Sequence, residues 1–137
     1  MNVAIDANVL IDMFERREPH YLPSAQVLSR VSSGKLVGVL AGHTVPNIYY
    51  VLRKICNRAI AEDAVDWMLR TFGVVAPTIE IMRDARKLPM TDFEDAIIAE
   101  SARVNRCDYV VTRDLKDFLH SPVPAVSPAN LLHLLGT

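Results

Sequence analysis

The chain has 137 residues, of which 50% are hydrophobic and 23% charged, and its net charge is −1. This composition predicts one globular domain, residues 1–137, and excludes a disordered chain. The nearly neutral charge gives no overall basic field for nucleic acid, although an acidic metal site would hide several basic residues in the sum. No apolar run approaches the roughly 18 residues of a membrane span. With two cysteines at no regular spacing and no signal peptide expected, we predict a cytoplasmic protein without membrane contact.

Strand-like and helix-like segments alternate along the chain, and hairpin signals are few. Expected strands cover residues 2–6, 36–41, 74–76, 108–112 and 125–126. Expected helices cover residues 7–14, 23–33, 44–56, 60–71, 77–88, 91–105 and 128–136, with a turn or short helix at 114–119. Short apolar strands alternating with helices predict an α/β fold with a central, mostly parallel sheet covered on both faces.

The first candidate site residue, Asp6, directly follows the apolar run Val3-Ala4-Ile5. A carboxylate in this place lies at the carboxyl end of a strand, where open α/β sheets bind ligands. The same residue also suits the N-cap of the next helix, so Asp6 alone does not decide between a cap and a catalytic acid. Asp12, farther along that helix, is expected to be solvated.

In the second acidic segment, Thr91 and Glu94 have the form of a capping box, which assigns Glu94 a structural role. Asp92 lies in the first turn, where a carboxylate suits the helix dipole. Asp95 precedes the aliphatic segment Ala96–Ala99, so its carboxylate is expected near the sheet and needs a cationic partner. Asp92 and Asp95 are three residues apart and share a helix face.

In the helix expected at 44–56, Thr44 is expected to be the N-cap.

The third acidic segment follows the strand expected at 108–112 and contains Asp114 and Asp117. Both residues are also typical of turns and caps. Thr112 is the last residue of that strand, and its hydroxyl is expected to face the same edge as Asp114. If the strands are parallel, their carboxyl ends bring this segment toward Asp6.

Several carboxylates at one sheet edge repel one another and are costly without a divalent ion. Hard oxygen ligands favour Mg²⁺ or Mn²⁺, and the four histidines show no pairing at zinc spacing. Acid–metal sites of this kind act on phosphodiesters. The chain has no nucleophilic serine or cysteine motif and no glycine-rich phosphate loop, which fits water as the nucleophile.

Four segments occur in an order and spacing that one family shares: Asp6–Asp12, Tyr49–Lys54, Asp95–Ala102 and Asp108–Phe118. Together they resemble the PIN-domain ribonucleases, and the size and layout resemble the VapC-like toxin branch. The resemblance spans essentially the whole chain. It implies a three-layer α/β/α domain that collects acids around Mg²⁺ or Mn²⁺ and cleaves RNA.

By position, the resemblance implies that Asp6, Asp95 and Asp114 are catalytic, metal-binding acids. The assisting residues that it implies are Asp117 as a further metal-site acid, Asp92 beside Asp95, and Thr112 as a supporting hydroxyl. One position departs from the pattern: many relatives carry Glu where this chain has Asn47. An amide still offers an oxygen near the metal site, but it removes a charge and cannot act as a base.

The sequence therefore predicts a metal-dependent endoribonuclease that is the toxin of a toxin–antitoxin pair. We expect it to bind an antitoxin protein and to form a homodimer. On charge alone, the candidates for contact with the RNA backbone are Arg53, Lys54, Arg113 and Lys116. Solvated helix faces and loop ends explain the same four residues.

Two rival functions remain open. Asn47 motivates a PIN scaffold that binds RNA or protein without catalysis. A haloacid-dehalogenase-like phosphatase or a receiver domain also begins with a strand that ends in Asp. The phosphatase would need a second Asp where this chain has Asn8. The receiver would need an acid pair and a late lysine that we do not find.

Overall fold

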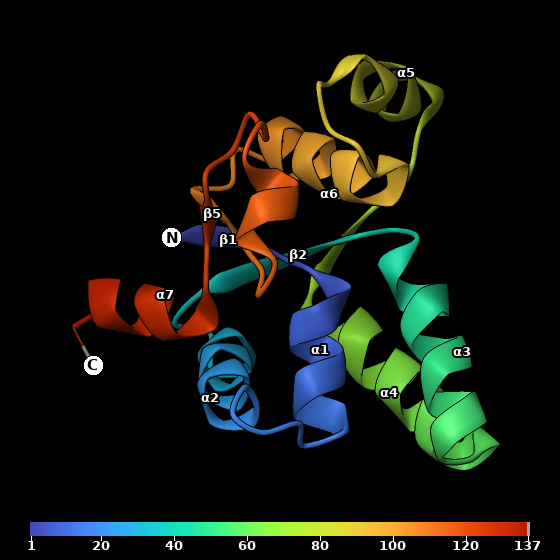
Figure 1. The fold of residues 1–137 in the computed structure, drawn as a ribbon. Coiled ribbons are helices and arrows are strands. Elements are labelled where there is room, and N and C mark those ends of the chain that lie inside the picture. Colours follow the sequence, from blue (N-terminus) through green and yellow to red (C-terminus); the bar gives the residue numbers. More distant parts are fainter. Residues whose placement is uncertain (137) are drawn as a thin grey trace.

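The computed structural model describes residues 1–136 (Figure 1). Its elements in chain order are β1 (Asn2–Ile5), α1 (Ala7–Phe14), α2 (Tyr21–Ser32), β2 (Val37–Ala41), α3 (Thr44–Ile55), α4 (Arg58–Thr71), β3 (Gly73–Val75), α5 (Ile79–Lys87), α6 (Phe93–Val104), β4 (Tyr109–Val111), the 3-10 helix η1 (Leu115–Phe118), β5 (Ala125–Val126) and α7 (Pro128–Leu134). In residues 1–136, the helices all lack the length and apolar character that crossing a membrane requires.

Helices cover both faces of a five-stranded sheet, which gives three layers, α/β/α (Figure 1). On one face lie α1, α2, α3, α4 and α7, and on the other lie α5 and α6. Successive side chains of a strand point to opposite faces. Accordingly, Val3 and Ile5 of β1 pack into the first core, while Ala4 packs into the second. The predicted α/β fold is confirmed.

The strand order is β3-β2-β1-β4-β5, and every neighbouring pair is parallel. β1 lies in the centre, and the chain adds strands on one side of it before it returns to the other. Such a reversal of strand order opens a crevice at the carboxyl ends of the central strands, where ligands bind in open α/β sheets. The backbone N–H of Asp6 donates to the carbonyl of Val111 at 3.0 Å, so the two strands end together at this crevice.

Helix caps explain two of the departures from the predicted helix starts. The helix predicted from residue 23 instead begins at Tyr21, without a side-chain cap. The helix predicted from Ile60 begins two residues earlier, because the Asn57 side chain accepts the backbone N–H of Ile60 at 2.9 Å. Thr44 was expected to be a cap but lies inside α3, with His43 in the cap position. Side chains of Ser, Thr, Asn and Asp act as caps only where the backbone before the helix is extended. His43 has a helical backbone instead, with φ −71° and ψ −17°.

The capping box predicted at Thr91 and Glu94 is wrong. The N-cap of α6 is Asp92, whose carboxylate accepts the backbone N–H of Asp95 at 3.0 Å. Asp is a stronger cap than Thr, and the extended backbone of Asp92 lets its short side chain reach that donor. Glu94 therefore has no capping role, and its side chain contacts Asn47 of α3 instead.

Gly38 allows the first helical layer to lie close on the sheet. A Cβ atom at this position of β2 would come within 2.6 Å of Val31 Cγ1 and 2.7 Å of Phe72 Cδ1. Real Cβ atoms essentially never approach so closely, so any larger residue must displace a core side chain.

Candidate active site

Asp6 is the most deeply placed acid of the crevice. It follows β1 and is only 7% exposed. Although it occupies the N-cap position of α1, its carboxylate makes no cap hydrogen bond. It accepts the hydroxyl of Thr112 at 2.8 Å instead. The side chain is thus held toward β4 and does not cap α1 by a hydrogen bond.

Thr112 and Asn8 join the ends of β1 and β4 by a small hydrogen-bond network. The Thr112 hydroxyl accepts the backbone N–H of Asp114 at 3.0 Å. Asn8 donates to Asp114 Oδ2 at 3.1 Å and to Thr112 Oγ1 at 3.4 Å, while its own oxygen accepts the backbone N–H of Arg113 at 3.4 Å. The network fixes the Asp114 carboxylate relative to Asp6. Sequence reasoning missed this role of Asn8, because no local pattern links residues more than a hundred positions apart.

Asp95 lies at the start of α6 and is partly exposed. Its pKa is raised to about 7, chiefly by burial and then by the nearby charges of Asp6, Asp92, Asp117 and Asp114, in that order. These influences show that acids from β1, α6 and η1 meet at one place.

The same crowding acts on Asp6. The pKa of Asp6 is raised to about 6. Burial and repulsion from Asp114 and Asp117 raise it, while hydrogen bonds from Thr112 and the backbone of Ala7 lower it. Two carboxyl groups with pKa values close to neutral, both surrounded by further acids, are typical of a functional site.

Asn47 and Glu94 form the side of the site nearest α3. The Asn47 amide donates to Glu94 Oε2 at 3.3 Å. Glu94, which the sequence assigned to a capping box, therefore faces the first turn of α3, where the resemblance expects an additional acid. Nearby, burial lowers the pKa of His43, while the charges of Glu94 and Asp92 oppose that change. Glu94 thus belongs to the surroundings of the site.

Asp12 was expected to be solvated, and this prediction is wrong. Its side chain is 1% exposed and forms a two-pronged ion pair with Arg113, Nε to Oδ2 at 2.8 Å and Nη2 to Oδ1 at 3.3 Å. The face of α1 that carries Asp12 packs toward the segment after β4, so the carboxylate is enclosed there. A buried carboxylate requires such a partner, and the pair raises the pKa of Arg113.

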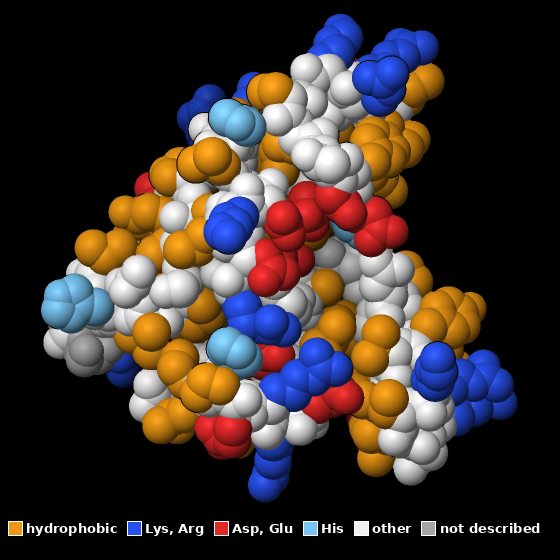
Figure 2. All heavy atoms as spheres, viewed as in Figure 1, with side chains coloured by type: hydrophobic (Ala, Val, Ile, Leu, Met, Phe, Trp, Pro, Cys, Tyr) orange, Lys and Arg blue, Asp and Glu red, His pale blue; other side chains and the backbone are white. Residues whose placement is uncertain are grey.

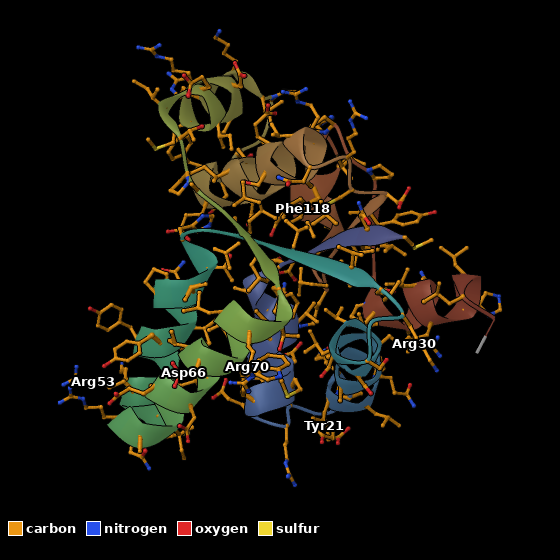
Figure 3. All side chains as sticks on the ribbon, turned by 180° about the vertical axis from the view of Figure 1, so that it is seen from behind. Tyr21, Arg30, Arg53, Asp66, Arg70 and Phe118 are labelled. Atoms are coloured by element: carbon orange, nitrogen blue, oxygen red, sulfur yellow. The ribbon has the colours of Figure 1, made fainter. Side chains whose placement is uncertain are left out.

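The basic residues predicted to contact RNA are placed differently from one another. Lys116 is exposed in η1, next to Asp117. Arg113 is 31% exposed, with its guanidinium in the pair with Asp12. Arg53 and Lys54 lie in the last turn of α3 (Figure 3), about 9 Å along the helix axis from Asn47.

Figure 2 shows a group of Asp and Glu side chains on this face, with Lys, Arg and His side chains beside it. Within residues 1–136, no three His, Cys, Asp or Glu side chains are gathered into a ready coordination shell. The group is nevertheless dense in carboxylate charge. It can attract a cation, and its high-pKa members can accept or hold protons near neutral pH.

The protein is an α/β/α sandwich with a parallel sheet and with acids at the carboxyl ends of its central strands. The model of the PIN domain family matches residues 2–116, and the chain belongs to that family.

One curated relative is Ribonuclease VapC1 of Aquifex aeolicus, 25% identical over 118 residues that span 82% of this chain and 81% of the relative. Among solved structures, a toxin–antitoxin complex from Klebsiella pneumoniae aligns with a TM-score of 0.69 and 22% identity, over 92% of this chain and 97% of that one. VapBC2 from Rickettsia felis aligns with a TM-score of 0.69 and 13% identity, over 93% and 98% of the two chains. At these identities the solved structures show a shared fold.

Proposed function

We propose that this protein is a metal-dependent endoribonuclease that hydrolyses RNA phosphodiester bonds, with Asp6, Asp95 and Asp114 as its catalytic acids. The observation that carries the proposal is the meeting of these three residues at the crevice, where burial and mutual repulsion raise the pKa of two of them. Membership of the PIN family and similarity to Ribonuclease VapC1 support it.

The donor set fits Mg²⁺ or Mn²⁺. Carboxylate oxygens are the ligands that these hard cations prefer, and positive charge would relieve the repulsion within the cluster. Asp6, Asp95, Asp114 and Asp117 would hold the ion, and Asn47, Asp92 and Thr112 would support the site around them. When bound, the cation supplies positive charge at the attacked phosphate and lowers the pKa of the attacking water. This assignment rests on donor chemistry and charge.

The protein's own residues orient the site. Thr112 fixes the Asp6 carboxylate, and Asn8 fixes that of Asp114, so neither acid has to be ordered when substrate arrives. Lys116, exposed beside the acidic group, is placed to meet a phosphate of the RNA backbone. Arg113, Arg53 and Lys54 extend the same role to more distant phosphates.

We further propose that the protein is the toxin of a toxin–antitoxin pair, acts in the cytoplasm and forms a homodimer. The fold that this chain shares with a toxin–antitoxin complex from Klebsiella pneumoniae supports this biological role. Induced expression should then arrest growth, and co-expression of the cognate antitoxin should restore it. Light scattering of the purified protein measures its molar mass, which distinguishes a homodimer from a monomer.

The enzymatic proposal is tested by incubating a mixed RNA pool with the purified protein in Mn²⁺, Mg²⁺ or chelator. Asp95→Asn is the test variant, and Asp63→Asn, at an exposed position of α4, is its matched control. We expect metal-dependent cleavage by the wild type and the control, and at least a hundredfold loss in Asp95→Asn.

The alternative function is a catalytically weakened PIN scaffold that binds RNA or protein. Asn47, which supplies an amide instead of a carboxylate, motivates this alternative. Calorimetric titration with Mn²⁺ separates the two functions, because a scaffold shows neither cleavage nor a saturable metal site. Full activity in Asp95→Asn would refute the assignment of the catalytic acids.

A further inference from the structure

A pocket of about 260 Å³ opens beside Arg113, between the start of α2 and the start of α7. Residues that line it include Pro19, His20, Pro23, Ser24, Arg113 and Pro128. Its size is just below the range of roughly 300–1,000 Å³ that is typical of small-molecule sites. The pocket therefore suits a compact ligand of one ring system better than an extended chain.

The pocket combines apolar walls with a few fixed polar groups. Proline side chains supply the walls, and the buried carboxylate of Asp12 holds the guanidinium of Arg113 in one orientation. A guanidinium fixed in this way offers a flat cationic surface on which rings stack. His20 adds a polar side chain to the pocket lining.

The pocket is linked directly to the acidic site. Arg113 precedes Asp114 in the chain, and its backbone N–H donates to Asn8, which also holds the Asp114 carboxylate. Figure 2 shows Lys, Arg and His side chains immediately beside the acidic group on this face. A polymer bound at the acids would thus meet cationic groups next, and phosphates are the natural counterpart of such groups.

We propose that this pocket is a nucleotide subsite, which takes one unpaired base of the RNA next to the phosphodiester at the acidic site. Protein sites for single-stranded RNA receive splayed bases by stacking them on aromatic rings or on arginine planes and by hydrogen bonding their edges. Arg113 supplies the plane, His20 supplies an edge contact, and the prolines exclude water. The inference rests on the proposed function, because it names the substrate group that the same site recognises.

A binding experiment without metal tests the pocket separately from catalysis. The probes are the four nucleoside 5′-monophosphates in chelator, and the readout is the NMR signal of the His20 ring, assigned with His20→Ala. Ala129→Leu, at an exposed position on the pocket rim, fills the pocket, and Ala59→Leu, at an exposed position of α4, is the matched control. We expect a saturable shift in the wild type and the control, and at least tenfold weaker binding in Ala129→Leu.

Cleavage of a random RNA library, mapped by sequencing, gives the second readout. The wild type and Ala59→Leu should show a base preference at one position beside the cut, and Ala129→Leu should lose it. Cleavage with an unchanged preference in a correctly folded Ala129→Leu, or no saturable nucleotide binding, overturns the subsite and leaves the nuclease intact. Saturable binding that Ala129→Leu abolishes, without cleavage by the wild type, supports the subsite and refutes the proposed nuclease.

Discussion

The metal-free protein should lose stability as the pH rises through the titration of Asp6. In the folded protein the pKa of Asp6 is raised from its ordinary value of 3.8 to about 6, chiefly by burial. The folded state therefore binds the proton more tightly than the unfolded state does. Linkage then requires that the free energy of unfolding falls between about pH 4 and pH 6 and stays level above that range.

The magnitude follows from the difference in pKa. A difference of about 2 corresponds to about 3 kcal/mol, at 1.36 kcal/mol for each pKa unit. Asp95, with a pKa raised to about 7, extends the decline toward neutral pH. The contribution of Asp95 to the loss of unfolding free energy is smaller than its pKa suggests, because solvent screens a partly exposed carboxylate. The repulsion between Asp95 and Asp6 must also not be counted twice, since the two groups titrate as a coupled set.

Urea unfolding in chelator between pH 4.5 and 7.5 measures this decline, with Asp6→Asn as the comparison. The amide can still accept the Thr112 hydroxyl but cannot ionise, so the variant should show a much flatter dependence. Added Mn²⁺ should restore stability most strongly at the high end of the range, because the ion binds the ionised acids. A wild-type stability that is constant or rising from pH 4.5 to 6 would refute the reasoning about Asp6.

Three further perturbations have defined outcomes. Asp12→Asn should lower the free energy of unfolding by about 3 kcal/mol in urea, because it leaves the guanidinium of Arg113 without its buried counter-charge. Asn8→Ala should lower kcat/KM for RNA about tenfold while costing only about 1 kcal/mol of stability, because it frees the Asp114 carboxylate; unchanged kinetics would count against the network. Gly38→Ala should cost about 1–3 kcal/mol by thermal unfolding, since its Cβ collides with core side chains.

The sequence predicted the architecture because the signals for it are local. Short apolar strands alternate with helices, and Asp6 and Thr112 directly follow two of those strands. Once the strands are parallel, their carboxyl ends must share one edge. The residues themselves pointed to Asp95, and the resemblance assigned Asp95 and Asp117 to the metal site. The structure brings their charges together with those of Asp6 and Asp114.

Helix starts were predicted less well, because two neighbouring residues often compete for one cap. Thr91 and Asp92 can both cap a helix, and only the backbone conformation selects Asp92. Because Asp92 is the cap, the Glu94 side chain is available to accept a hydrogen bond from Asn47 of α3. A local pattern identifies candidates for a cap, but the path by which the chain enters the helix decides among them.

By itself, the sequence determined the layer order of this protein and the acids that end its strands, because chain periodicity and strand direction fix both. Only the tertiary structure decided that Asp12 is buried against Arg113, that Asn8 joins the ends of β1 and β4, and that a pocket opens beside them. These contacts join residues about a hundred positions apart. Their energies depend on how α1 packs against the segment after β4, which no local sequence pattern encodes.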